Sequence, residues 1–296
     1  MRVMITGGAG YVGTVLVESM MYEYEVVVYD NLLYGGAGLL HYVSDPGIEF
    51  VHGDILDSQK MRAASRGCDV IIHLAAIVGY PACNNMGPLA DRINIDGTNN
   101  VLDLGIPTIF GSTQSVYGKQ DGLVTEETTP FPQTSYARSK FLAERAVLTG
   151  NGLVLRFPTL FGPSPRMRWD LIVNDFVYQA AMDHVLVVYQ PEASRPILHV
   201  QDAAYFYMAA LRGELGPGLH NIGNKDLVYT KGEIAEAVQK ELGCEVIYRE
   251  FDTDKDARDY RIEFSDRLPR PLLGLQEGIE ALVKAVKLTE RTWRNA

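Results

Sequence analysis

Short apolar runs rich in β-branched residues alternate with segments of helical spacing through the first half of this 296-residue chain. Parallel strands have this composition because crossover helices bury both faces of their sheet. The alternating order therefore predicts an α/β fold with a doubly wound parallel sheet. The predicted strands are residues 3–6, 25–29, 48–51, 70–74, 108–110 and 153–156, and the predicted helices are residues 12–21, 58–65, 93–103 and 135–148.

The pattern changes after Pro158, where an irregular segment rich in Pro and Arg begins. The sequence predicts a strand at residues 197–200 and then a helix over 203–211, with Asp202 as its N-cap. We expect this strand to rejoin the sheet of the first half of the chain. We therefore expect a first domain over residues 1–158, with a return at about 195–212, and a smaller C-terminal region over 159–296. This region has predicted helices at 171–182, 230–242 (ending at Gly243) and 277–288, and a strand at 185–189.

The overall composition excludes several classes of protein. The 27 Lys and Arg residues against 37 Asp and Glu give a net charge of −10, which argues against a general nucleic-acid binder. The three cysteines (Cys68, Cys83 and Cys244) show no C-x-x-C spacing, and the histidines lack metal-ligand spacing, so neither a disulfide framework nor a metal site is predicted. The sequence shows no signal peptide and no membrane span, and the expectation is a soluble, cytoplasmic protein.

A glycine-rich turn connects the first predicted strand to the first helix. Gly8-Ala9-Gly10-Tyr11-Val12-Gly13 satisfies the G-x-G-x-x-G pattern of dinucleotide-binding proteins. Glycines let the chain turn tightly and approach a pyrophosphate closely, and the helix N-terminus offers N–H groups to the phosphates. An ordinary turn between a strand and a helix is the alternative interpretation of the glycines alone.

Asp30 ends the second predicted strand, 17 residues after Gly13. A carboxylate at this place accepts hydrogen bonds from a ribose 2′-hydroxyl and repels a 2′-phosphate. The sequence therefore favours NAD over NADP as the cofactor. It also predicts that residues 1–158 form a Rossmann-type NAD-binding domain. The alternative is that Asp30 only terminates the strand.

Tyr136 and Lys140 are four residues apart on a predicted helix, so their side chains share one face. An ammonium group beside a phenol lowers the phenol pKa from its usual value of about 10. Tyr136 could then exchange protons near neutral pH. A solvated helix face is the simpler interpretation of the pair taken alone.

Taken together, these motifs resemble the extended short-chain dehydrogenase/reductase family, in the NAD-dependent nucleotide-sugar epimerase/dehydratase branch that includes UDP-galactose 4-epimerase. The resemblance runs from Met1 to about Asp202. It implies Thr113, Tyr136 and Lys140 as catalytic residues, with hydride transfer between a sugar and NAD. The cofactor-binding residues that it implies are Gly7, Gly10, Tyr11, Val12, Gly13, Asp30, Asn31, Asp54, Ile55, Leu74, Ala75, Ala76, Asn94, Tyr136 and Lys140.

The same resemblance implies a nucleotide-diphosphate sugar as substrate and a homodimer as the assembly. Thr113 and Thr159 would contact the sugar, although relatives usually have Asn at the Thr159 position. Asn174 and Arg195 match residues that contact the phosphates. Arg258 or Arg261 is a candidate second phosphate ligand, because Arg can bind phosphate oxygens through two hydrogen bonds.

One departure from the family favours a particular reaction. Dehydratases and uronate decarboxylases of this branch carry acidic residues directly after the catalytic Thr, whereas this chain has Gln114 and Ser115. Neither side chain is a general acid near pH 7, so dehydration is disfavoured. We expect an NAD-dependent nucleotide-sugar epimerase acting through a transient 4-keto sugar. The alternatives are a 4-ketoreductase or dehydrogenase and, less favoured, a dehydratase or a catalytically silent NAD-binding regulator.

Overall fold

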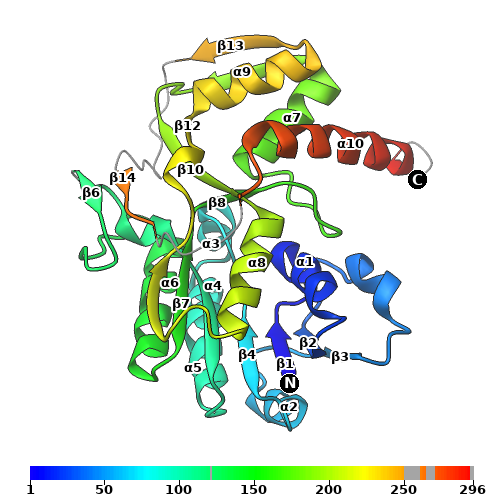
Figure 1. Ribbon diagram of the computed structural model, residues 1–296, viewed down its shortest axis with the longest axis vertical. Helices are drawn as coiled ribbons and strands as arrows, with labels where there is room; N and C mark the ends of the chain where they lie inside the picture. The colour runs from blue at the N-terminus through cyan, green and yellow to red at the C-terminus, as the bar shows by residue number, and fades with distance from the viewer. Residues whose placement is uncertain (121, 250–260, 265–270, 294–296) are drawn as a thin grey trace.

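The centre of the molecule is a parallel sheet of seven strands in the order β11-β7-β5-β4-β1-β2-β3. The computed structural model describes residues 1–120, 122–249, 261–264 and 271–293 (Figure 1). The strands are β1 (Arg2–Thr6), β2 (Glu25–Asp30), β3 (Ile48–His52), β4 (Val70–His73), β5 (Thr108–Thr113), β7 (Leu153–Phe157) and β11 (Gly218–Asn221). All six strands predicted for the first domain are confirmed, and each pair of neighbours is parallel.

Helices cover both faces of the sheet because successive strand residues point in opposite directions. Val3 and Ile5 of β1 pack in the core that includes residues of α1 (Tyr11–Met20) and α8 (Val200–Leu211). Met4, between them, packs on the opposite face against residues of α2 and α5. The helices on that opposite face are α2 (Ser58–Ala64), α5 (Gly97–Leu102) and α6 (Ser135–Thr149).

The late return to the sheet differs from the prediction. The segment predicted as a returning strand is β10 (Ser194–His199), and it pairs with β8 (Thr159–Phe161) and β12 (Val228–Thr230) instead. The seventh strand of the main sheet is β11, which pairs with β7. Its four residues, GLHN, lack the apolar run that marked the other strands.

Two helix starts also differ from the prediction. Asp202 is not an N-cap, because α8 begins at Val200 after His199, and the Asp202 carboxylate accepts a hydrogen bond from the Leu273 N–H group (2.8 Å). The helix predicted at 93–103 begins earlier, as α4 (Pro88–Asp91), and continues through a π-helical stretch (Arg92–Asp96) into α5.

The C-terminal region lies above the carboxyl ends of the sheet strands and carries α7, α9, α10 and β13 at its far end (Figure 1). Thr230 caps α9 and forms a capping box with Glu233, and Gly243 ends the helix in the left-handed conformation, as predicted. No helix within the described ranges is both long enough and apolar enough to cross a membrane. The remaining elements are α3 (Tyr80–Met86), β6 (Leu123–Val124), α7 (Ile172–Asp183), β9 (Val185–Tyr189), α9 (Lys231–Leu242), β13 (Glu245–Arg249), β14 (Arg261–Ile262), α10 (Leu275–Trp293) and 3-10 turns at Ala37–Tyr42, Gln114–Tyr117 and Lys225–Leu227.

Candidate active site

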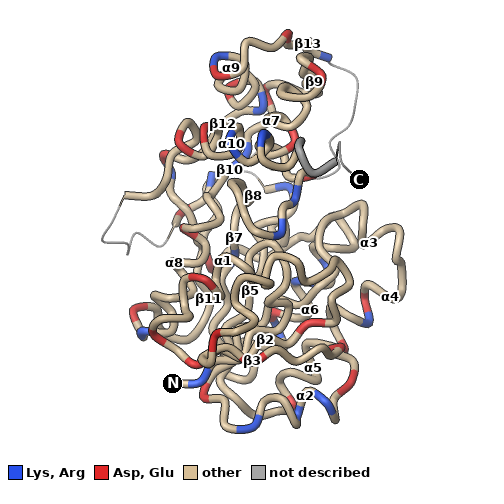
Figure 2. The backbone as a smooth tube through the Cα atoms, turned by 90° about the vertical axis from the view of Figure 1, so that its right-hand side faces the viewer, with Lys and Arg blue, Asp and Glu red and all other residues tan. Residues whose placement is uncertain are grey.

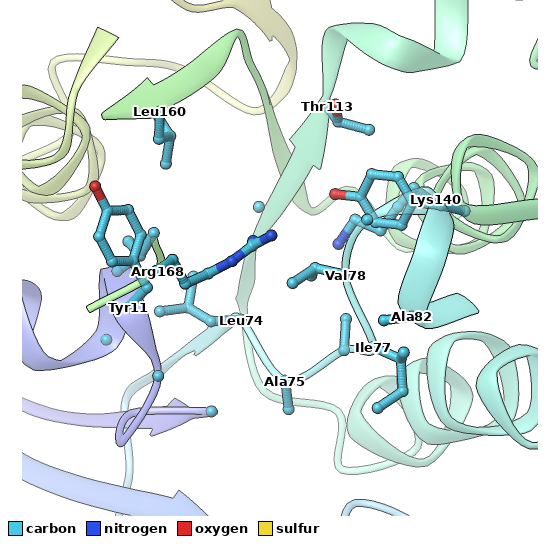
Figure 3. A pocket seen from close by; sticks show the side chains of 18 of the residues that line it. Tyr11, Leu74, Ala75, Ile77, Val78, Ala82, Thr113, Lys140, Leu160 and Arg168 are labelled. Carbon is cyan, nitrogen blue, oxygen red and sulfur yellow. The ribbon is translucent and has the colours of Figure 1, made fainter. Parts of the chain in front are cut away.

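A cavity of about 720 Å³ lies where the C-terminal region meets the carboxyl ends of the sheet strands. Figure 3 places Thr113 and Lys140 on one side of it, Tyr11 and Leu160 on the other, and Arg168 pointing between them. The predicted residues that line the cavity are Gly7, Gly10, Tyr11, Val12, Gly13, Asp30, Asn31, Asp54, Ile55, Leu74, Ala75, Ala76, Thr113, Tyr136, Lys140, Thr159 and Arg195. Thus one cavity contains most residues of both the predicted cofactor site and the predicted substrate site.

The glycine-rich turn is shaped by two close approaches of backbone to backbone. Gly7 has a φ of 74°, and a Cβ at this residue would lie 2.6 Å from the Ala75 nitrogen. At Gly13 a Cβ would lie 2.5 Å from the Gly7 oxygen. Side chains at these positions would force the turn apart, so the exposed backbone at the start of α1 depends on glycine.

Asp30 and Asp54 lie at the end of the cavity formed by β2 and the segment after β3. Asp30 accepts hydrogen bonds from the N–H groups of Ala9 (3.0 Å) and Leu32 (2.7 Å). The Asn31 side chain donates to Asp54 (3.0 Å). Asp30 therefore does more than end a strand, because it also holds the glycine-rich turn in place.

A buried polar chain supports the loop Leu74–Ala76 at the floor of the cavity. Thr98 donates its hydroxyl hydrogen to the Asn94 carbonyl (2.7 Å), so it must accept from Nε2 of His73 (2.9 Å). Nδ1 of His73 then accepts from the Thr6 hydroxyl (2.7 Å). Burial lowers the pKa of His73 to about 3, with the nearby Lys140 charge adding to the effect, so this imidazole stays neutral.

Asn94, a predicted cofactor residue, does not line the cavity and is 2% exposed. Its amide oxygen accepts from the Ile77 N–H group (2.8 Å), and its nitrogen donates to the Ile77 carbonyl (2.9 Å) and the Ser139 hydroxyl (3.0 Å). The side chain therefore fixes the cavity loop against α6. The π-helical stretch carries it to this position.

Thr113, Tyr136 and Lys140, the predicted catalytic residues, all line this cavity. Thr113 ends β5, while the other two residues lie one turn apart on α6. Lys140 is 3% exposed, and its Nζ lies 3.9 Å from the centre of the Phe110 ring. Burial lowers the pKa of Lys140 to about 7, although the Glu144 carboxylate opposes this effect.

The predicted substrate residues are only partly together. Thr159 and Arg195 line the cavity, and Arg195 is buried with Nη1 donating to the Ser194 carbonyl (2.8 Å). Asn174 does not line it: it is fully buried and holds Gly162, Tyr11 and Arg168 by hydrogen bonds. Arg258 lies outside the described residues, and Arg261, on β14, is exposed and away from the cavity.

Arg166, Arg168 and Tyr207 are among the lining residues for which the sequence predicted no role. The two arginines follow the Pro-rich segment after β8, and basic positions also appear near the label β8 in Figure 2, where the two regions meet. Tyr207 comes from α8, and a Cβ at Gly111 would lie 2.3 Å from its hydroxyl oxygen. The high Arg content of the segment was the only sequence signal, because no spacing rule links these residues to the glycine motif.

The site thus defines a class: a Rossmann-type dinucleotide enzyme with a threonine at the carboxyl end of a strand and a tyrosine and a lysine on a neighbouring helix. A model of the NAD dependent epimerase/dehydratase family matches residues 3–223. The chain therefore belongs to this family of NAD-dependent enzymes.

Two relatives and two solved structures illustrate the range of the family. The chain is 30% identical over 243 residues to a UDP-N-acetyl-alpha-D-glucosaminuronate decarboxylase of Bacillus cytotoxicus, covering 76% of this chain and 75% of the relative. It is 25% identical to a putative UDP-glucose 4-epimerase of Methanocaldococcus jannaschii (98% and 100% covered). The UDP-glucuronic acid 4-epimerase of Bacillus cereus, solved with UDP-glucuronic acid and NAD, superposes with a TM-score of 0.88 at 23% identity (98% and 100% covered). A dTDP-glucose 4,6-dehydratase of Streptomyces venezuelae, solved with NAD, gives 0.87 at 25% identity (99% and 98% covered).

The residues present fit NAD. The glycine cradle at Gly7 and Gly13 leaves backbone exposed for a pyrophosphate, Asp30 suits ribose hydroxyls, and Lys140 lies at the other end of the same cavity. In the part of the chain that is described, no three His, Cys, Asp or Glu side chains gather as metal ligands would.

Proposed function

We propose that this protein is a nucleotide-sugar epimerase that acts at C4 through a transient keto sugar. The supporting observation is the absence of a carboxylic acid at the two positions after Thr113. The Gln114 amide is buried and donates to the carbonyls of Ile222 (2.8 Å) and Arg156 (3.3 Å). Ser115 donates its N–H group to Thr113 (3.2 Å). Expulsion of water from the sugar needs a general acid, and neither side chain supplies one near pH 7.

The chain's own residues would divide the proton chemistry among them. Tyr136 would accept the proton of the sugar 4-hydroxyl and return it after the keto group has been reduced. Thr113 would donate a hydrogen bond to the same oxygen, and a charged Lys140 would stabilise the tyrosine anion. When bound, NAD would supply the group that accepts the hydride from C4 of the sugar and gives it back.

The rest of the proposal concerns binding and assembly. Residues 1–158, together with α8 and β11, would bind NAD, and the C-terminal region would select the nucleotide sugar. Arg195 and Arg168 would bind its charged groups, as cations in a partly desolvated cavity do. A homodimer through α5 and α6 would have a small interface, since the helix that continues into α5 already ends at Leu102. The unpaired Cys68, Cys83 and Cys244 suit the reducing cytoplasm.

The test is product analysis. Purified protein is incubated with UDP-glucose, UDP-glucuronate, UDP-N-acetylglucosamine and the corresponding GDP-, CDP- and dTDP-sugars, and the products are separated by anion exchange and identified by NMR. We expect a C4 epimer of at least one sugar with no net change in NADH. The absence of a C4 epimer in every mixture would overturn the proposal.

The same mixtures identify the other activities. Loss of carbon dioxide would indicate a decarboxylase, and loss of water a dehydratase. Stoichiometric oxidation of NADH on a keto sugar would indicate a ketoreductase. Tyr136→Phe serves as the blank for each reaction, because it removes only the phenolic oxygen.

A further inference from the structure

The segment between β8 and α7 folds back onto the glycine-rich turn. We call residues 162–170 the strap. The Tyr11 hydroxyl donates to the Gly162 carbonyl (2.7 Å), and the Ser164 hydroxyl donates to the Tyr11 carbonyl (2.7 Å). The hydroxyl groups of Ser164 and Thr14 are 2.9 Å apart. These contacts are buried, so the strap is fixed to the first turns of α1.

The strap also closes against the segment that follows β2. A Cβ at Gly38 would lie 3.1 Å from the Pro165 carbonyl carbon and 3.2 Å from the Arg166 nitrogen. The Arg166 guanidinium lies 4.5 Å from the centre of the Tyr34 ring. Since Tyr34 comes four residues after Asp30, this contact joins the C-terminal region to the adenosine end of the cavity.

The charge of the strap is only partly compensated. Arg168 is paired with Asp170 through two hydrogen bonds of 3.1 and 2.5 Å. In the described ranges Arg166 has no carboxylate at ion-pair distance, and its Nη1 donates to the Met167 carbonyl (3.1 Å). Burial and the Arg168 cation lower the pKa of Arg166, while Tyr34, Asp170 and Asp30 oppose this effect. A partly buried cation without an anion beside it favours an anionic ligand.

We propose that the strap is a latch for the cofactor, in which Arg166 lies over Tyr34 and binds the diphosphate of NAD together with the α1 N-terminus. The diphosphate is then held both by backbone N–H groups and by a guanidinium. The ligand must cross the Arg166–Tyr34 contact to leave. The latch therefore keeps NAD bound between turnovers, as an enzyme that regenerates its own cofactor requires.

The test measures retention of NAD without any sugar. Protein loaded with carbon-14 NAD is mixed with excess unlabelled NAD, and the loss of label is followed by rapid filtration for the wild type, Arg166→Ala, Tyr34→Ala and Gly38→Ala. Loss of a charge-assisted contact predicts release about tenfold faster or more in Arg166→Ala. Tyr34→Ala should show a smaller increase. Gly38→Ala should also speed release, because the added methyl group displaces the strap while charge and ring remain.

Arg62→Ala is the matched control, since Arg62 is an exposed arginine on α2 and should leave the release rate unchanged. Melting temperatures show that each variant is folded. Release from folded Arg166→Ala at the wild-type rate overturns the proposal, as does wild-type NAD that exchanges within the mixing time. If Arg166→Ala does not fold, release of NAD from Tyr34→Ala at the wild-type rate overturns the proposal. Because no sugar is present, this result is independent of whether the protein is an epimerase.

Discussion

The two ends of the cavity are built in different ways. At the cofactor end, the shape comes from backbone: Gly7 and Gly13 exclude side chains, and Asp30 holds the turn that they form. At the opposite end, which we propose holds the sugar, side chains from β5, α6, β8, β10 and α8 converge. The cofactor end therefore tolerates little change in main-chain geometry, whereas the sugar end can change its specificity by exchanging side chains.

A variant at the sugar end should abolish the chemistry and leave the cofactor end intact. Tyr136→Phe removes the proposed acid–base group, and we expect turnover to fall by about 10²–10⁴, the usual contribution of such a group. NAD content and melting temperature should match the wild type, as measured by chromatography of released cofactor and by calorimetry. Tyr22→Phe is the control, since Tyr22 is 87% exposed. Unchanged turnover in Tyr136→Phe would remove this tyrosine from the mechanism.

A buried ion pair between α6 and β7, outside the cavity lining, should determine stability instead. Glu144 on α6 and Arg156 on β7 are 1% and 2% exposed, and Nε of Arg156 donates to Glu144 (3.1 Å). Glu144→Gln leaves a buried cation without its anion, so we expect a loss of roughly 3–5 kcal/mol in the free energy of unfolding. Urea denaturation measures it, with exposed Glu236→Gln as the control. Equal midpoints in the two variants would contradict this role.

The same contrast explains what the sequence could predict. The predicted strands of the sheet and the glycine turn are local patterns, so they were located to within a residue or two, except that β5 runs three residues further than predicted. The pair Tyr136 and Lys140 follows from helical spacing. β11 was missed because GLHN has no strand-like apolar run, and its place is set by pairing with β7.

The surroundings of residues whose roles came from the family resemblance were harder to predict than the positions of the elements. The amides of Asn94 and Asn174 bind this chain's own backbone and side chains instead of facing the cavity. Arg166 and Arg168 reach the cavity only because the strap folds back by tertiary contacts. Local sequence patterns could not predict these contacts, because they join residues about 150 positions apart in the sequence.

The buried Lys140 should make the stability of the protein depend on pH. Its folded-state pKa of about 7 lies below the unfolded value of about 10.5, so between these values the unfolded chain binds more protons. The stability of the NAD-free protein should therefore rise with pH from about 7 to 10, with Lys140 contributing up to about 1.4 kcal/mol per pH unit. Urea unfolding at several pH values tests this slope. Lys140→Met should lack this contribution, whereas exposed Lys240→Met should keep it, and parallel curves for all three proteins would contradict the assignment.

Asn174 links the two ends and should give the smallest effect. Its amide binds the Gly162 N–H group (2.9 Å), the Arg168 carbonyl (2.9 Å) and the Tyr11 hydroxyl (3.3 Å). Asn174→Ala removes this partner from the buried Gly162 N–H group and the Arg168 carbonyl, so we expect a loss of about 1–3 kcal/mol in the free energy of unfolding, with exposed Asn99→Ala near the wild type. Hydrogen exchange should increase in the strap and at the start of α1 but not in β4 or β5, because the glycine turn keeps its own backbone contacts. An increase in hydrogen exchange throughout the sheet would show that the two ends of the cavity do not depend on separate sets of contacts, and it would contradict the contrast drawn between them.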